Sequence, residues 1–169
     1  MSAARFTAQS FEDEARAKVA DEIPGADLDV FAATFDLIRL ATRIMHDLES
    51  TVHRPAGWSY AGFRVMFTVW VSGSLPPMEI ARLSGLSRAA VSSVINTLER
   101  DGLVTRTRES DDRRVVTVRL TDEGESRLAA AYAEQNARST RLWRDLSTDE
   151  LRTLTDLCRR ALGTSRETD

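Results

Sequence analysis

Two short amphipathic segments separated by one glycine constrain the fold of this chain more than any other feature. Residues 78–84 have room for two helical turns. Gly85 follows as a turn residue, and Ser87 is placed to cap a second helix from Arg88 to about Asp101. In both segments apolar residues recur at helical spacing and predict one inward face, formed by Ile80, Leu83, Val91, Val94, Ile95 and Leu98. Two short helices joined by a tight turn that contains glycine are the helix-turn-helix pattern.

A β-hairpin is predicted directly after this pair of helices. Residues 103–108 alternate between apolar and polar side chains, and residues 115–120 are rich in β-branched residues, so both segments indicate strands. The polar residues 109–114 between them suit an exposed hairpin tip. A helix-turn-helix followed by such a hairpin is a winged helix-turn-helix, in which the hairpin is the wing.

Three helices are expected before the helix-turn-helix. The first begins at a capping box of Ser10 and Asp13 and ends before Pro24. A second runs from its N-cap Asp27 to about Thr51. The third begins after Ser59, with an inner face formed by Phe63, Met66, Phe67 and Trp70.

Two more helices are expected after the hairpin. One runs from Thr121 to roughly Leu146, and a capping box of Ser147 and Glu150 opens the last. The predicted fold class is therefore mostly α with a small β-hairpin wing, a winged helix-turn-helix core flanked by N- and C-terminal helices.

The residue counts exclude several classes of protein. A single cysteine, Cys158, permits no intrachain disulfide, and two histidines leave no Cys/His cluster for zinc, so neither a metal nor a cofactor is expected. The longest apolar run, residues 65–71, is far shorter than the ~20 residues that span a bilayer. The single cysteine and the lack of a basic-then-apolar signal pattern in residues 1–14 lead us to expect a cytoplasmic protein. The sequence shows neither a Gly-rich phosphate loop nor a Ser/His/Asp set, so we do not expect an enzyme.

The charge distribution separates the ends of the chain from its middle. The net charge is −3 for all 169 residues. Residues 1–36 carry three basic and eight acidic side chains, a net charge of −5, whereas residues 82–119 carry eight arginines and five acids, a net charge of +3. The positive charge therefore lies over the helix-turn-helix and the wing, and the planar fork of arginine suits phosphate and guanine.

Three motifs occur in order along this middle region. Residues 78–87 read MEIARLSGLS, residues 98–104 read LERDGLV, and Asp112-Arg113-Arg114 precedes the run LTDEG at residues 120–124. In wording and spacing they resemble the MarR family of bacterial transcriptional regulators, over about residues 28–163. The resemblance implies a sequence-specific regulator of double-stranded DNA, expected to be a repressor.

One face of the helix that starts at Arg88 carries the candidate base contacts. A helix that enters the major groove needs small and polar residues on its outer face, so that its backbone approaches the base edges. That face holds the cap residue Ser87 together with Arg88, Ala89, Ser92, Ser93 and Asn96. Taken alone, this face fits the solvated side of an amphipathic helix equally well. The wing that follows the helix favours the interpretation as a DNA contact.

The wing carries a second set of candidate contacts. In winged helices the hairpin tip reaches the neighbouring minor groove, whose negative potential attracts arginine. By the resemblance, Arg114 is the inserted residue and Asp112 pairs with it to hold its orientation. Arg106, Arg108 and Arg113 are expected to contact phosphates, which supply affinity without sequence choice.

The resemblance also implies a division of the chain and a homodimer on a palindromic operator. Residues 1–26 are an acidic N-terminal helical extension, 27–57 a dimerisation helix, 58–120 the DNA-binding lobe, and 121–169 the C-terminal dimerisation helices. The extension lies outside the usual family pattern and either packs across the dimer or extends loosely. The candidate interface residues, which alternatively form a monomeric core, are Phe31, Leu142, Trp143, Leu151 and Leu154.

A small-molecule effector is a further implication of the resemblance. Members of the family commonly bind small aromatic or otherwise amphipathic anions between the dimerisation helices and the DNA-binding lobe. A phenolic or aromatic acid is therefore a candidate, held by the residues that fall near that cleft by position in the chain: Arg43, His46, Trp58 and Arg64. Alternatively, Trp58 packs at a helix entry and the polar residues are solvated or paired with neighbouring acids.

The alternative function is a winged-helix protein-interaction module without DNA specificity, because a fold does not fix a function. Such a module more often shows an apolar patch on the outer face of residues 88–96, where this sequence is small and polar. A metal-dependent repressor is disfavoured because clusters of ligand residues are lacking.

Overall fold

In the computed structural model, which describes residues 8–108 and 116–164, the chain divides into two units, residues 1–49 and residues 50–169. The first unit holds α1 (Ala8–Glu22) and α2 (Leu28–Leu48). A π-helical turn, η1 (Glu49–His53), follows α2. The remaining elements are α3 (Tyr60–Ser72), α4 (Pro77–Ser84), α5 (Arg88–Arg100), β1 (Val104–Arg108), β2 (Val116–Leu120), α6 (Asp122–Leu142) and α7 (Thr148–Thr164). The predicted fold class, mostly helical with a two-stranded hairpin, is confirmed.

In the first unit, α1 packs against α2. The rings of Phe11 and Phe35 stack with their centroids 6.2 Å apart, and Arg39 Nη1 lies 3.2 Å from Glu12 Oε2. The Asp27 side chain accepts hydrogen bonds from the backbone N–H groups of the first turn of α2, which confirms the predicted N-cap. The cap predicted at Ser10 is wrong, because α1 already begins at Ala8 and contains Ser10.

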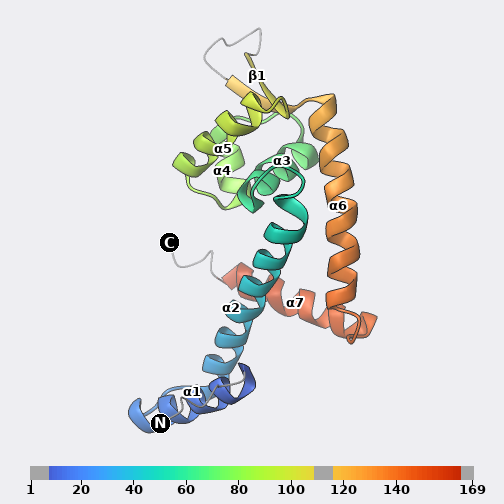
Figure 1. The fold of residues 1–169 in the computed structure, drawn as a ribbon. Coiled ribbons are helices and arrows are strands. Elements are labelled where there is room, and N and C mark those ends of the chain that lie inside the picture. Colours follow the sequence, from blue (N-terminus) through green and yellow to red (C-terminus); the bar gives the residue numbers. More distant parts are fainter. Residues whose placement is uncertain (1–7, 109–115, 165–169) are drawn as a thin grey trace, which may run out of the picture. The chain divides into compact units, whose positions relative to one another are not determined.

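The core of the second unit is built around α3. This helix packs against α4, α5, β2 and α6, and α4, α5 and the hairpin gather beside it (Figure 1). The core side chains are apolar and almost completely buried: Val65, Met66, Val69, Ile80, Val91, Ile95, Leu98, Leu103, Val118 and Leu128. The helix-turn-helix and the wing therefore form around one hydrophobic core.

Side-chain caps fix where three of these helices begin. Ser59 accepts a hydrogen bond from Gly62 N at 3.1 Å, Ser87 from Ala90 N at 3.2 Å, and Thr121 from Gly124 N at 3.0 Å. All three predicted starts are confirmed. Each cap satisfies a backbone N–H that has no partner within its own helix.

The wing is an antiparallel hairpin in which Val104 pairs with Leu120 and Arg106 with Val118. A third segment joins it on the other edge of β2. There Leu75 N donates to Val118 O at 3.1 Å, and Val118 N donates to Leu75 O at 2.8 Å. The sequence patterns did not predict this pairing, because Leu75 and Val118 lie more than forty residues apart.

Two predicted inward side chains face solvent instead. Leu83 is 48% exposed, because α4 is only two turns long and buries the side that carries Ile80, Ala81 and Ser84. Trp70 is 46% exposed, because α3 turns Val65 and Val69 toward the core. Apolar residues on several sides of α3 made the choice of its inner face ambiguous.

The helices after the wing match their predictions in part. α6 ends at Leu142, four residues before the predicted end. The capping box of α7 is confirmed, with Ser147 N donating to Glu150 Oε2 at 2.7 Å and Glu150 N donating to Ser147 Oγ at 3.3 Å. Along the described part of the chain, every helix is too short or too polar to cross a membrane.

Candidate nucleic-acid interface

The outer face of α5 consists of Ser87, Arg88, Ala89, Ser92, Ser93 and Asn96. All six residues are exposed, as the sequence predicted. Val91, Ile95 and Leu98 lie on the opposite side and are no more than 2% exposed. The buried side holds α5 firmly on its lobe, and the outer face leaves only small and polar groups on the surface.

The turn between α4 and α5 is closed by its own backbone and by α3. Gly85 has φ +65°, in the left-handed region, and its N–H donates to Ala81 O. The guanidinium of Arg64, on α3, donates to the carbonyl of Ser84. This bond links residues twenty positions apart, so helical spacing alone could not have predicted that Arg64 stabilises the turn.

Arg106 connects the wing to α5. Its guanidinium donates to the Glu99 carboxylate, and its Nη2 donates to Asn96 Oδ1 at 2.6 Å. The Arg106 and Glu99 side chains are 32% and 37% exposed. The wing strand β1 is therefore bonded to the same helix that carries the outer face.

For the other candidate wing residues, the structure describes only the backbone of Arg108. Arg108 is the last residue of β1 and pairs with Val116, and its side chain is not among the parts that the structure describes. Asp112, Arg113 and Arg114 also lie outside the described residues. Their contacts with DNA remain predictions.

The four candidate effector residues fall in different surroundings. Arg43 and His46 are exposed on α2 in the first unit. In the second unit, Trp58 is 5% exposed just before α3, with the Arg127 guanidinium carbon 5.3 Å from its ring centroid. Arg127 also donates to the carbonyl of Ala56, and Arg64 is bonded to the helix-turn-helix. A cation stacked on an indole occurs here, but the cation comes from Arg127, which the sequence did not single out.

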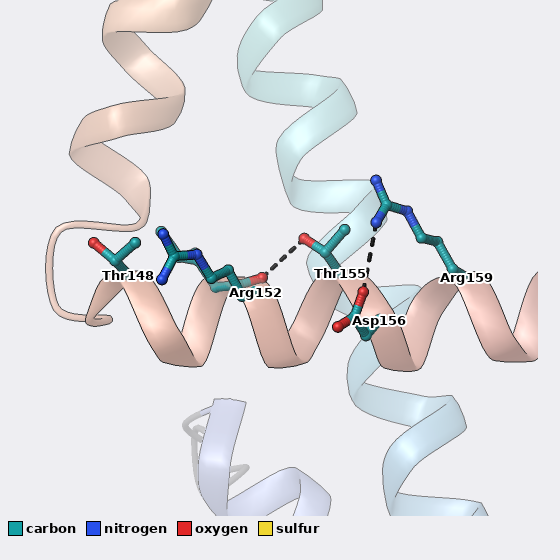
Figure 2. Close-up of a pocket in the computed structure, with 6 residues that line it drawn as sticks. Thr148, Arg152, Thr155, Asp156 and Arg159 are labelled. Carbon is teal, nitrogen blue, oxygen red and sulfur yellow. Dashed lines mark hydrogen bonds and ion pairs between the residues drawn. The ribbon is translucent and has the colours of Figure 1, made fainter.

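A hollow on the surface of α7 is lined by that helix alone. Figure 2 shows Thr155, Asp156 and Arg159 along one side, where Arg159 Nη1 lies 3.5 Å from Asp156 Oδ1. Because every lining residue belongs to one helix, the hollow is an open face and does not enclose a ligand. Among the residues that the structure describes, no three His, Cys, Asp or Glu side chains group to hold a metal ion.

A helix-turn-helix with a polar outer face on its second helix, followed by an antiparallel hairpin, defines a winged helix-turn-helix protein. The model of the MarR family matches residues 58–116. The chain is also 32% identical over 138 residues to the uncharacterized HTH-type transcriptional regulator YwaE of Bacillus subtilis (strain 168), covering 82% of this chain and 81% of YwaE. The chain belongs to the MarR family of transcriptional regulators.

Two further relatives carry more specific names. The HTH-type transcriptional repressor YetL of Bacillus subtilis (strain 168) is 27% identical over 108 residues, 63% of this chain and 62% of YetL. Among solved structures, the transcriptional repressor CouR bound to a 23-mer DNA duplex superposes with a TM-score of 0.69 at 28% identity. That match covers 76% of this chain and 91% of CouR.

Proposed function

We propose that this chain is a cytoplasmic, homodimeric repressor that binds a palindromic double-stranded DNA operator. The observation that carries the proposal is the outer face of α5, where six small or polar residues are exposed on a helix whose other side is buried. The names of YetL and CouR support repression, and CouR was solved on DNA. An interaction module would instead present apolar side chains on this face.

The outer face of α5 is assigned to the major groove. Arg88, at the N-terminal end of α5, is placed to reach base edges, where arginine pairs with guanine. Ser87, Ala89, Ser92 and Ser93 are small enough for the α5 backbone to lie close to the bases. Asn96 is the longest polar side chain further along the face and is a second reader of bases.

The wing is assigned to the backbone and the minor groove. Arg114 inserts into the minor groove with Asp112 holding its orientation, and Arg108 and Arg113 contact phosphates. Two such lobes are needed, because one winged helix buries little DNA surface and specific binding needs more contact. Residues 58–120 are accordingly the DNA-binding lobe.

Residues 27–57 and 121–169 are assigned to dimerisation. Large apolar side chains are exposed on both segments of the single chain, and a second copy would cover them. On α2 they are Val30, Leu37, Ile38 and Met45, and on α6 and α7 they are Leu142, Leu157 and Leu162. Residues 1–26 form an extension whose helix α1 packs on α2 within the first unit.

We further propose that a small aromatic acid binds the protein and releases it from its operator. In addition to the four candidate residues, an aromatic cluster on α3 and α6 of the second unit supports this proposal. In it, the Phe67 ring centroid lies 5.4 Å from that of Tyr132 and 5.9 Å from that of Trp70. Trp70 and Tyr132 remain partly exposed and offer a surface on which a ring can stack. Phenolic acids that leave operator affinity unchanged across a screen would contradict this part of the proposal alone.

Selection of bound fragments from random DNA tests the central proposal. We expect an imperfect palindrome whose half-sites lie about 10 base pairs apart, because two recognition helices then enter successive major grooves on one side of the duplex. Affinity should fall steeply as salt rises. Recovery of no enriched symmetric motif would support the protein-interaction module instead.

Substitutions in the selected operator complex then test the roles of the residues. Arg88→Ala should cost about 1–3 kcal/mol and relax the preference at one position of each half-site. Arg114→Ala should weaken all related sites and reduce any preference for A·T-rich flanks, and Asp112→Ala should do the same more mildly. Equal losses for all three, with the base preference unchanged, would mean that helix and wing contact only phosphates.

A further inference from the structure

Arg106, Asn96 and Glu99 form a hydrogen-bonded set, here called the Arg106 fork, at the junction of β1 and α5. One guanidinium reaches two acceptors on the recognition helix: Nη1 donates to the Glu99 carboxylate, and Nη2 donates to Asn96 Oδ1 at 2.6 Å. Asn96 and Glu99 are three residues apart, so they lie on the same side of α5 and a single planar fork can span them.

The chemistry of arginine fixes which end of the Asn96 amide faces it. A guanidinium has five N–H donors and no acceptor, so only the carbonyl oxygen of the amide can face it. A bond from a charged donor is shorter and stronger than one between neutral groups, in keeping with the 2.6 Å distance. The Nδ2 end of the amide, with its two N–H donors, is therefore the end that remains available on this exposed residue.

Glu99 makes the arrangement firm before any DNA is bound. Its carboxylate holds the guanidinium from a second direction, and about two thirds of the Arg106 side chain is shielded from solvent. The charge of Arg106 is also offset by Glu99, which reduces its attraction for a phosphate. A side chain held by two partners costs little further ordering when the complex forms.

We propose that Arg106 is a positioning residue that makes Asn96 a hydrogen-bond donor to the operator. In the major groove, a free asparagine pairs with adenine by two bonds, donating to N7 and accepting from N6. With its oxygen engaged by Arg106, Asn96 donates from Nδ2 to a base acceptor, which is guanine O6 or N7, thymine O4 or adenine N7, and adenine loses the advantage of its second bond from N6. This inference rests on the proposed function, and it assigns a direction of reading to one position of each half-site.

Single-position substitution of the selected operator tests the inference with full-length protein. Every base pair of one half-site is replaced by the other three, and affinities are measured for the wild type and for Arg106→Met. Removal of the fork frees the Asn96 oxygen. At the operator base pair that Asn96 contacts, affinity for adenine should therefore rise about tenfold relative to affinity for guanine or thymine. Glu99→Gln added to Arg106→Met removes the remaining unpaired carboxylate and should keep the same change in preference.

Arg119→Met is the matched control. Arg119 is an exposed arginine on β2, outside the fork, and its loss removes one wing charge without freeing Asn96. It should leave the base preference unchanged at every position. If Arg106→Met behaves like Arg119→Met, with relative affinities within about twofold of the wild type at every position, the inference is overturned and Arg106 is a phosphate contact.

Asn96→Asp gives an independent reading if Arg106→Met does not fold, as judged by circular dichroism. Aspartate retains an acceptor for Arg106 but replaces the donor by a second acceptor, so the preferred base should change to one with a donor, cytosine or adenine. An unchanged preference at every position would overturn the inference. Absence of any base preference in the wild type would instead contradict the proposed function, so the two failures are distinguishable.

Discussion

At the scale of single residues, Gly124 shows why the motif LTDEG at residues 120–124 ends in glycine. A Cβ atom on Gly124 would lie 2.0 Å from Leu103 O, a backbone atom that cannot move aside cheaply. The same carbonyl accepts from Thr121 N at 3.1 Å, and Thr121 Oγ1 donates to Gly102 O at 2.7 Å. Residues 120–124 thus attach the start of α6 to the segment that leaves α5, and only glycine permits the approach.

Gly124→Ala should destabilise the protein by about 1–3 kcal/mol, because the added methyl group forces the start of α6 away from Leu103. The matched control is Gly163→Ala, where a Cβ would meet nothing within 4 Å on helix α7. That variant should be unchanged or up to about 1 kcal/mol more stable, since alanine favours helix. Denaturant midpoints compare the two, and similar midpoints for both variants would refute the close-approach argument.

At the scale of elements, helix starts and the strand pair were predictable because their signals are local. Ser59, Asp27 and Thr121 cap helices through bonds that span two or three residues, so the sequence alone reveals them. Contacts between distant segments were not predictable in this way. Leu75 beside Val118 and Arg106 beside Asn96 depend on how the helix-turn-helix and wing fold together.

The capping box of α7 predicts a pH effect. The Ser147 hydroxyl donates to the Glu150 carboxylate, as does the Ser147 backbone N–H, and both bonds lower the pKa of Glu150 below its usual value. The folded state therefore favours the ionised carboxylate. Its contribution to stability is present above the ordinary pKa of glutamate and is lost as pH falls through the lowered pKa.

Ser147→Ala should raise the pKa of Glu150, because the larger of the two causes is removed while the backbone N–H remains. Thr148→Ala removes a neighbouring hydroxyl that makes no bond in the box, so it should leave the pKa of Glu150 unchanged. NMR titration of the Glu150 carboxyl carbon measures both. The same titration curve for Ser147→Ala and the wild type would show that the hydroxyl does not stabilise the carboxylate.

At the scale of the whole molecule, large apolar side chains are exposed on α2 in the first unit and on α7 in the second. Leu37 is 53% exposed on α2, and Leu157 and Leu162 are 52% and 70% exposed on α7. Helical spacing predicted that these helices are amphipathic, but it could not show whether a second copy or the same chain covers their apolar faces. Two-fold symmetric pairing would bury both sets and bring two DNA-binding lobes to one operator.

The wild type should therefore sediment as a dimer at micromolar concentration, at twice the 18.8 kDa of one chain. Leu37→Glu and Leu157→Glu should each shift the protein toward monomer, because a charge that the second copy buries loses its hydration without gaining a partner. Val71→Glu is the matched control, since Val71 is 65% exposed on α3, outside the proposed dimerisation segments, and its variant should remain dimeric. The monomeric variants should also bind the operator more weakly, because only one lobe engages each molecule of DNA. A wild-type monomer at this concentration, or equal dimerisation of all three variants, would contradict the proposed interface.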